Sequence, residues 1–328
     1  MRFSRTFHTA LAAWLMLGAS LAAAQPATAY PARPIKVVVP YAPGGMTDVS
    51  SRAVMERLGK ELGQAVVIEN KAGAASTLAS NWMVTQPADG YTLYAAPVSL
   101  VINPILQGTV QYDARKDFEP ISLMIDSPFV LQVHPGLGVR SMKELLARVR
   151  EHPDRYAIGT SGAGSVNHLA AEYFLRAFHL KVAVVHYRGG APAAQDLMGG
   201  TIQMMFSAAN EAAPLMRSGR TVGIAVTTTQ RLALLPDLPT MEEASGLRDF
   251  EAVFWMALVA PARTPAPVLA RLREAMQKIG ADPELRERLA RLGVELVTST
   301  PRDVQRRMDR DEAKWGQLIR ELNIQEGT

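Results

Sequence analysis

The sequence contains no cysteine among its 328 residues, so disulfide bonds cannot contribute to its stability. It is also poor in aromatic residues, at 6%, and its 31 acidic and 35 basic residues nearly balance. A nucleic-acid-binding protein would show a basic patch interleaved with aromatic side chains, and the sequence has none. The basic residues of the C-terminal part alternate with acidic ones at helical spacing, which is typical of solvated helix faces.

Signatures of metal binding and catalysis are equally scarce. The histidines lack the spacing of metal ligands, so we expect neither a metal nor a cofactor. The stretch from Gly162 begins like a dinucleotide-binding motif, but Asn167 stands at its sixth position. Ser161 and Ser165 occur in neither G-x-S-x-G nor S-x-x-K. An exported serine hydrolase stays open as an alternative, although the lack of a placed base favours binding over catalysis.

The N-terminal residues carry an apolar run at 10–17 that is shorter than the roughly 20 residues of a membrane span. The run follows Arg2 and Arg5 and precedes small residues, which is the order of a secretory signal peptide. We therefore predict that residues 1–29 form a signal peptide, cleaved after Ala24 or Ala29, and that the mature chain is soluble in the periplasm. No cysteine lies at either cleavage position, which excludes a bacterial lipoprotein anchor.

Strand-like and helix-like segments alternate from residue 35 onward, which favours α/β layers with a largely parallel sheet. Two long apolar segments, 121–133 and 251–261, bracket a middle part with an alternation of its own. A chain that crosses to a second domain and returns has two such strands, and its ligand cleft lies between the domains. The expected domains are residues 30–130 plus 255–328 for domain 1, and residues 131–254 for domain 2.

Three glycine-rich turns each follow an apolar strand-like run and precede a helical pattern, at 41–46, 161–165 and 187–191. A glycine-rich turn at a helix start presents free N–H groups and the positive end of the helix dipole. Each turn is therefore typical of an anion site. Because no catalytic side chain accompanies them, the turns predict capture of a small anion without chemistry on it.

The candidate ligand-binding residues lie in these turns, in the loop before Trp82 and at the end of the strand-like run near residue 207. They are Tyr41, Ala42, Gly44, Gly45, Met46, Ala74, Ala75, Ser76, Ser161, Gly162, Ala163, Gly164, Ser165, His168, Tyr187, Gly189, Gly190, Ala191, Ser207 and Asn210. Gly44 and Gly45 are also compatible with a turn that needs a positive φ, and His168 with a structural histidine. Asp48 is expected to cap its helix rather than to contact an anion.

Short motifs that occur in order along the chain carry a resemblance to a known family. They include Tyr41-Ala42-Pro43-Gly44-Gly45, Asp89-Gly90-Tyr91, Gly162-x-Gly164-Ser165-x-x-His168, Asp196-Leu197-x-Gly199-Gly200 and Leu235-Pro236-Asp237-x-Pro239-Thr240. In these motifs the sequence resembles the Bug-type extracytoplasmic solute receptors, the periplasmic substrate-binding components of tripartite tricarboxylate transporters. Each motif alone is weak, but the ordered set covers nearly the whole mature chain and is specific.

The resemblance implies a two-lobed, type II periplasmic-binding-protein fold, with two α/β domains joined by two crossing strands. Such a protein is not an enzyme: it closes on a small mono-, di- or tricarboxylate, held by backbone groups and bridging waters, and delivers it to integral-membrane permease subunits. We expect a monomer, and a sensor that presents the carboxylate to a signalling partner stays open as an alternative. Ser207 stands where the family commonly has an acidic residue, and the loop 73–78 departs from the family pattern. These departures leave the identity of the ligand open, but they do not change the expected fold.

Overall fold

The computed structural model describes residues 30–107, 110–187, 189–248 and 250–324, so the predicted signal peptide lies outside the described residues. The elements of the described part are, in chain order, β1 (Ile35–Val39), α2 (Met46–Leu62), β2 (Val66–Asn70), η1 (Ala74–Ser76), α3 (Thr77–Met83), β3 (Thr92–Pro97), α4 (Ser99–Leu106), β4 (Phe118–Val133), η2 (Pro135–Leu137), α5 (Met142–Glu151), η3 (Pro153–Arg155), β5 (Ala157–Thr160), α6 (Val166–Ala177), β6 (Ala183–His186), α7 (Gly190–Gly199), β7 (Met204–Ala208), α8 (Ala209–Arg217), β8 (Val222–Val226), α9 (Met241–Ser245), β9 (Val253–Pro261), α10 (Ala266–Gly280), α11 (Pro283–Arg291), β10 (Glu295–Leu296) and α12 (Pro301–Leu322).

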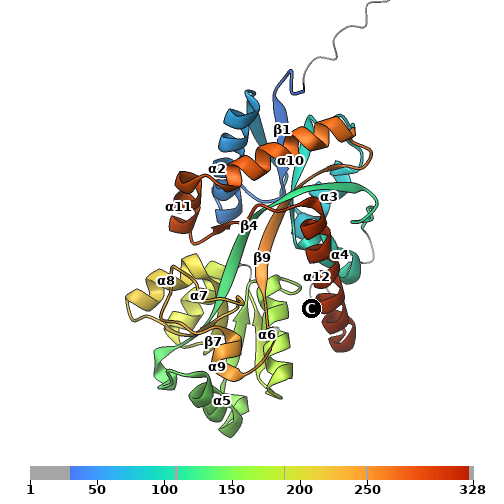
Figure 1. Cartoon of the computed structure of the whole chain (residues 1–328). Coiled ribbons are helices and arrows are strands. Elements are labelled where there is room, and N and C mark those ends of the chain that lie inside the picture. The colour runs from blue at the N-terminus through green and yellow to red at the C-terminus, as the bar shows by residue number, and fades with distance from the viewer. Residues whose placement is uncertain (1–29, 108–109, 188, 249, 325–328) are drawn as a thin grey trace, which may run out of the picture.

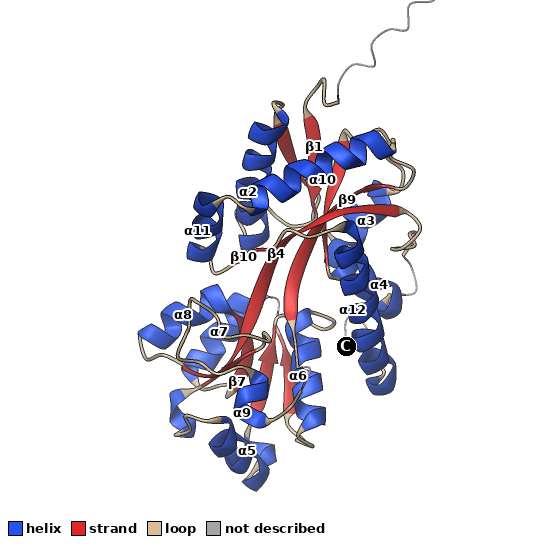
Figure 2. Cartoon of the chain, viewed as in Figure 1, coloured by secondary structure: helices blue, strands red, loops and turns tan. Residues whose placement is uncertain are grey.

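The strands follow one path, β2-β1-β3-β9-β4-β7-β5-β6, and β8 and β10 also pair with β4. β1 is parallel to β2 and β3 in one lobe, and β5 is parallel to β6 and β7 in the other. Between these groups β4 and β9 run antiparallel to each other and cross from lobe to lobe (Figure 1). Helices lie on both sides of the strands in each lobe (Figure 2). The chain therefore forms two α/β lobes joined by a two-stranded ribbon.

The 16-residue strand β4 changes partner along its length. Its first part pairs with β9 as far as Pro128, which lies opposite Val253, and its last part pairs with β7 and β8. Proline has no N–H group to donate to a ladder, so it suits the position where one pairing ends. The predicted domain boundaries near residues 130 and 255 both fall in this ribbon, and the division into domains stays a prediction.

The core explains why the apolar runs became these elements. Ile35, Val37 and Val39 of β1 are fully buried, as expected for an interior strand of a parallel group. One cluster of buried side chains lies between β1, α2 and α10, and a second extends from lobe 1 into lobe 2 through Trp255 and Phe206. Within the described residues, no helix is long and apolar enough to cross a membrane.

The last helix, α12, begins as its sequence predicts: Thr300 caps it, Pro301 occupies its first turn, and Asp303 completes a capping box. In Figure 1 it leaves lobe 1 and runs beside the ribbon towards α6 of lobe 2. The indole N–H of Trp255 donates to a carboxylate oxygen of Asp311 over 2.6 Å. α12 therefore braces the crossing strands from one side.

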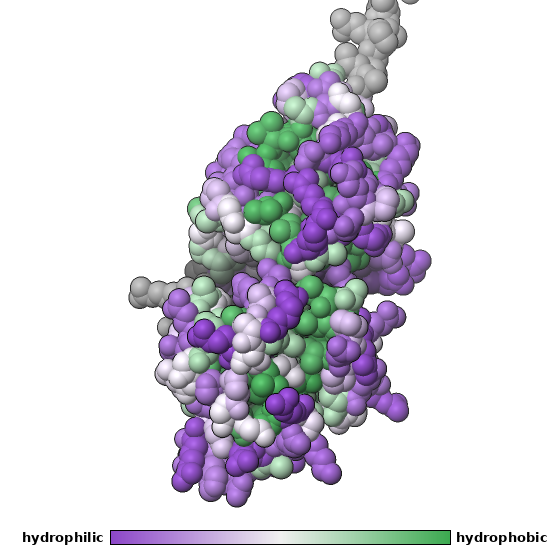
Figure 3. Space-filling model, turned by 90° about the vertical axis from the view of Figure 1, so that its left-hand side faces the viewer, coloured by the Kyte–Doolittle hydropathy of each residue, from purple (hydrophilic) through white to green (hydrophobic). Residues whose placement is uncertain are grey.

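Polar residues cover most of the molecular face that contains α8 and α11, and apolar residues gather in separate patches on both lobes (Figure 3).

Candidate functional site

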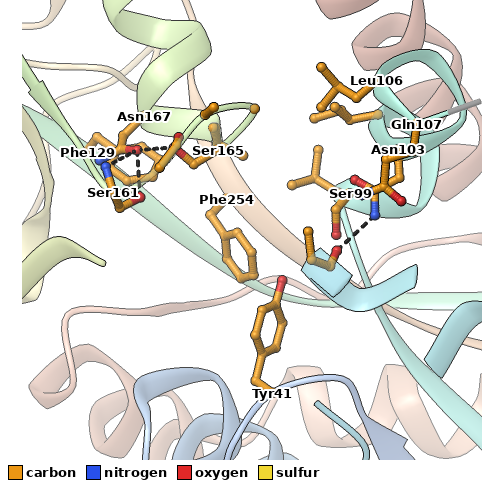
Figure 4. A pocket seen from close by; sticks show the side chains of 17 residues that line it. Tyr41, Ser99, Asn103, Leu106, Gln107, Phe129, Ser161, Ser165, Asn167 and Phe254 are labelled. Carbon is orange, nitrogen blue, oxygen red and sulfur yellow. Dashed lines mark hydrogen bonds between the residues drawn. The ribbon is translucent and has the colours of Figure 1, made fainter. Parts of the chain in front are cut away.

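A cavity of about 330 Å³ lies between the two lobes, within the size range of small-molecule sites. Lobe 1, lobe 2 and the crossing strands all contribute to its wall (Figure 4). The lining residues are Tyr41, Ala75, Val98, Ser99, Ile102, Asn103, Leu106 and Gln107 from lobe 1, Ser161, Gly162, Ala163, Gly164, Ser165, Val166 and Asn167 from lobe 2, and Phe129 and Phe254 from the ribbon. A change in the angle between the lobes would therefore change the shape of the cavity.

The lobe-2 wall is the turn between β5 and α6. Its two glycines, Gly162 and Gly164, have φ of +137° and +75°, a region that residues with a Cβ rarely adopt. Three N–H groups at this helix start, those of Ala163, Val166 and Asn167, have no acceptor among the described residues, and all three residues line the cavity. Free N–H groups at the positive end of a helix dipole can hold a carboxylate.

Asn167 organises the hydroxyl groups of the same turn. Its Oδ1 atom accepts hydrogen bonds from Ser161 Oγ over 2.8 Å and from Ser165 Oγ over 2.6 Å, as Figure 4 shows. Its Nδ2 atom donates to the carbonyl of Phe206 over 3.2 Å. Neither serine is hydrogen-bonded to an imidazole among the described residues. The turn thus lacks the pairing of a nucleophile with a base that covalent catalysis requires.

The lobe-1 wall includes a strained segment, Ala74–Ser76, whose residues have φ of 45°, 48° and 81°. Each left-handed residue of this kind costs about 1–2 kcal/mol. Asn103 holds the segment, because its Nδ2 atom donates to the Ala75 carbonyl over 2.8 Å and to Thr77 Oγ1 over 2.9 Å. Thr77 Oγ1 donates in turn to Gln107 Oε1 over 2.7 Å. This network fixes the backbone where it borders the cavity, as strain at functional sites requires.

The remaining wall is neutral. Tyr41 meets Phe254 edge to face with 6.0 Å between ring centroids, and burial raises the pKa of its phenol, which therefore stays protonated and can donate. Ile102, Leu106 and Phe129 add apolar surface. Among the described lining residues none carries a charge. An anion bound here would be met by neutral donors and helix dipoles.

The structure brings the second and third glycine turns together, because the Gly189 N–H donates to the Ser161 carbonyl over 3.1 Å, but the three turns differ in how far they open onto the cavity. In the first, Asp48 lies in the first turn of α2, as expected, and accepts a hydrogen bond from the Gly44 N–H just before that helix over 2.9 Å. Burial opposes ionisation of Asp48, but hydrogen bonds from Arg52, Gly44 and Asn70 outweigh it and lower the pKa. The helix start of this turn therefore already faces a carboxylate of the chain.

The third turn also has a carboxyl group near its helix start. A methyl group built on Gly190, the first residue of α7, would lie 3.1 Å from Glu211 Oε2. A carboxylate from α8 thus stands beside the helix start where an anion was expected. The second turn, at 161–165, is the one of the three that opens fully onto the cavity.

Seven of the predicted site residues line the cavity: Tyr41, Ala75, Ser161, Gly162, Ala163, Gly164 and Ser165. The others lie outside its lining: Ala42, Gly44, Gly45, Met46, Ala74, Ser76, His168, Tyr187, Gly189, Gly190, Ala191, Ser207 and Asn210. Ten lining residues were not predicted, namely Val98, Ser99, Ile102, Asn103, Leu106, Gln107, Phe129, Val166, Asn167 and Phe254. One signal for them existed: polar residues 99, 103 and 107 recur every four positions in an apolar stretch and share one helix face.

Within the described residues, no group of three or more histidines and carboxylates is placed to hold a metal ion. The site therefore offers backbone N–H groups, hydroxyls and amides on an apolar wall. Such a set binds and orients a ligand.

The sequence model of the tripartite tricarboxylate transporter family receptor matches residues 50–324. The chain belongs to this receptor family. The receptor is 32% identical to the protein BugT of Bordetella pertussis over 306 residues, which cover 92% of the receptor and 93% of BugT. The predicted resemblance to Bug-type receptors is thereby confirmed.

Solved structures confirm the fold. The structure of the periplasmic binding protein BugD shares 32% identity and a TM-score of 0.75 with the receptor, over 90% of the receptor and 99% of BugD. The structure of R. palustris Rpa4515 with adipate shares 30% identity and a TM-score of 0.78, over 90% and 99% of the two chains. The two-lobed α/β prediction is correct, and the receptor is a substrate-binding protein rather than an enzyme.

Proposed function

We propose that the receptor captures a small carboxylate in the cavity between its lobes and delivers it to the permease subunits of a tripartite transporter. One observation carries the proposal: the unpaired N–H groups of Ala163, Val166 and Asn167, at the start of α6, border a cavity shared by both lobes. Membership of the receptor family supports the delivery step. The adipate in the structure of Rpa4515 supports the class of ligand.

In this proposal the carboxylate sits at the start of α6, and the body of the ligand lies along Ile102, Leu106 and Phe254. One contact between an anion and a helix dipole stabilises by only about 0.3–1 kcal/mol. Hydrogen bonds to a charged group contribute about 1.5–3 kcal/mol each. Several N–H donors acting together can therefore offset the desolvation of a carboxylate without a basic side chain.

Closure follows from the same geometry, because each lobe supplies one wall of the cavity. A ligand that contacts both walls favours the closed arrangement, and a hinge in the ribbon near Pro128 and Trp255 would absorb the change. The proposal places the receptor in the periplasm as a monomer, after removal of residues 1–29. It hands the ligand over when contact with the permease opens the lobes.

Thermal unfolding of the mature receptor with a panel of mono-, di- and tricarboxylates tests this function. A true ligand at 100-fold its Kd stabilises the folded state by about 2.7 kcal/mol, which raises the Tm by several degrees. The matched control for each acid is its neutral amide, which we expect to leave the Tm unchanged, and chromatography should recover each acid unaltered. Stabilisation by the amides but by none of the acids would contradict the proposal.

A further inference from the structure

A buried histidine stands directly behind the ligand turn. His168, in the first turn of α6, is 3% exposed, and its Nδ1 atom accepts a hydrogen bond from the Gly164 N–H over 2.9 Å. Gly164 is a lining residue, and a methyl group built on it would lie 2.7 Å from Leu106 Cδ1 of lobe 1. His168 is therefore not a lining residue of the cavity, but it fixes the Gly164 peptide, where lobe 2 comes close to lobe 1.

The hydrogen bond determines the state of this imidazole. A backbone N–H can only donate, so Nδ1 must carry no proton, and the proton of the neutral ring lies on Nε2. Glu172, one turn further along α6, places Oε1 3.5 Å from that Nε2 atom. Protonation of Nδ1 would replace the acceptor by a second donor facing the Gly164 N–H. The charged imidazolium and the present turn conformation are therefore incompatible.

A second histidine completes the cluster. The ring of His186, at the end of β6, packs against His168 edge to face with 4.5 Å between centroids, and its Nδ1 atom is 2.7 Å from Thr160 Oγ1. Burial, and then the neighbouring His168, lower the pKa of His186. Of the titratable groups that contact His168 in the described structure, Glu172 on its own helix favours its charged form and His186 on β6 opposes it.

We propose that His168 is a positioning residue of the binding site, and that its protonation releases the turn 161–165 and with it the carboxylate. The proposal rests on the proposed function, because it requires the ligand to bind at this turn. Binding is then linked to a neutral His168, so any acidification that protonates this ring weakens binding, by up to tenfold per pH unit.

The test is calorimetric measurement of Kd between about pH 5 and pH 8, with a carboxylate from the panel, on the receptor and three variants. His168→Asn keeps an acceptor at the δ position and does not titrate. We expect it to bind as tightly as the unmodified receptor at pH 8 and to lose the decrease in acid. His168→Gln moves its amide one bond further out, and His168→Ala removes the acceptor, so both should bind about tenfold more weakly at pH 8.

His186→Asn is the control for the neighbouring ring, and we expect it to keep the acid-sensitive binding of the unmodified receptor. Thermal unfolding establishes that each variant is folded. The NMR resonance of the Gly164 amide should shift with pH in the unmodified receptor but not in His168→Asn. An acid-induced loss of affinity that persists unchanged in His168→Asn would overturn the proposal while leaving the proposed function intact. Failure of the unmodified receptor to bind any carboxylate at pH 8 would overturn both.

Discussion

Replacement of Gly164 by valine is expected to abolish carboxylate binding while the receptor still folds. Gly164 has φ +75°, and a Cβ atom at this position would lie 2.7 Å from Leu106 Cδ1 of lobe 1. Rotation of the Leu106 side chain can accommodate one methyl group, but valine adds two more to the space between the lobes. It also shifts the turn that carries the free N–H groups. We expect affinity to fall by at least 100-fold, or about 2.7 kcal/mol, as measured by calorimetry.

Gly138→Val is the matched control for this variant. Gly138 has a similar φ of +67°, lies in lobe 2 outside the cavity, and has no neighbour within 4 Å of the position of a Cβ. The left-handed conformation costs each valine about 1–2 kcal/mol of stability. Both variants should therefore lose stability, whereas Gly164→Val alone loses its ligand. Equal affinities for the two variants would show that the ligand does not occupy this part of the cavity.

Replacement of Arg307 by alanine is expected to destabilise the receptor by about 3–5 kcal/mol, the cost of leaving a buried charge without its partner. The Nη1 atom of Arg307 on α12 lies 2.7 Å from Oδ2 of Asp126 on β4, and the two side chains are 12% and 14% exposed. Burial raises the pKa of Asp126 to about 6, even though Arg307 acts in the opposite direction. Without Arg307 the carboxylate would have to be protonated or stay charged within the ribbon.

The raised pKa of Asp126 determines how the stability deficit of Arg307→Ala changes with pH. Loss of Arg307 raises the folded-state pKa of Asp126 further, so the extra cost relative to the unmodified receptor appears as the pH rises above about 6. The deficit of Arg307→Ala should therefore be largest at neutral pH and shrink towards pH 4, as measured by urea unfolding. Arg306→Ala removes an exposed partner of Asp303 on the same helix and should change stability little. A deficit of Arg307→Ala that is equal at both pH values would contradict this explanation.

The fold was predictable because its signals are local. The buried run of β1, the capping residues of α12 and the two long apolar segments each lie within about 20 residues of sequence. Which of the three glycine turns opens onto the cavity could not be predicted from local sequence in the same way. Asp48 lies within four residues of the turn that it faces, and its role was predicted. Glu211 reaches Gly190 only through the packing of α8 against lobe 2, which the sequence pattern does not reveal.

Tyr41 and Ala75 of the lobe-1 wall were predicted, but the part of that wall formed by α4 was missed. This helix follows β3 after a single residue and has no glycine turn, which was the feature that marked the other candidate residues. Ala74 and Ala75 were predicted as site residues, but their left-handed conformations, which alanine normally avoids, were not. Their conformation depends on Asn103, which lies 28 residues from Ala75.

The most direct test of the account is a crystal structure of the receptor with the carboxylate that stabilises it most. The account predicts that the carboxylate oxygens lie about 2.7–3.2 Å from the backbone nitrogens of Ala163, Val166 and Asn167, with the ligand body against Leu106 and Phe254. A carboxylate bound at the first glycine turn, in place of Asp48, or outside the cavity between the lobes would contradict it.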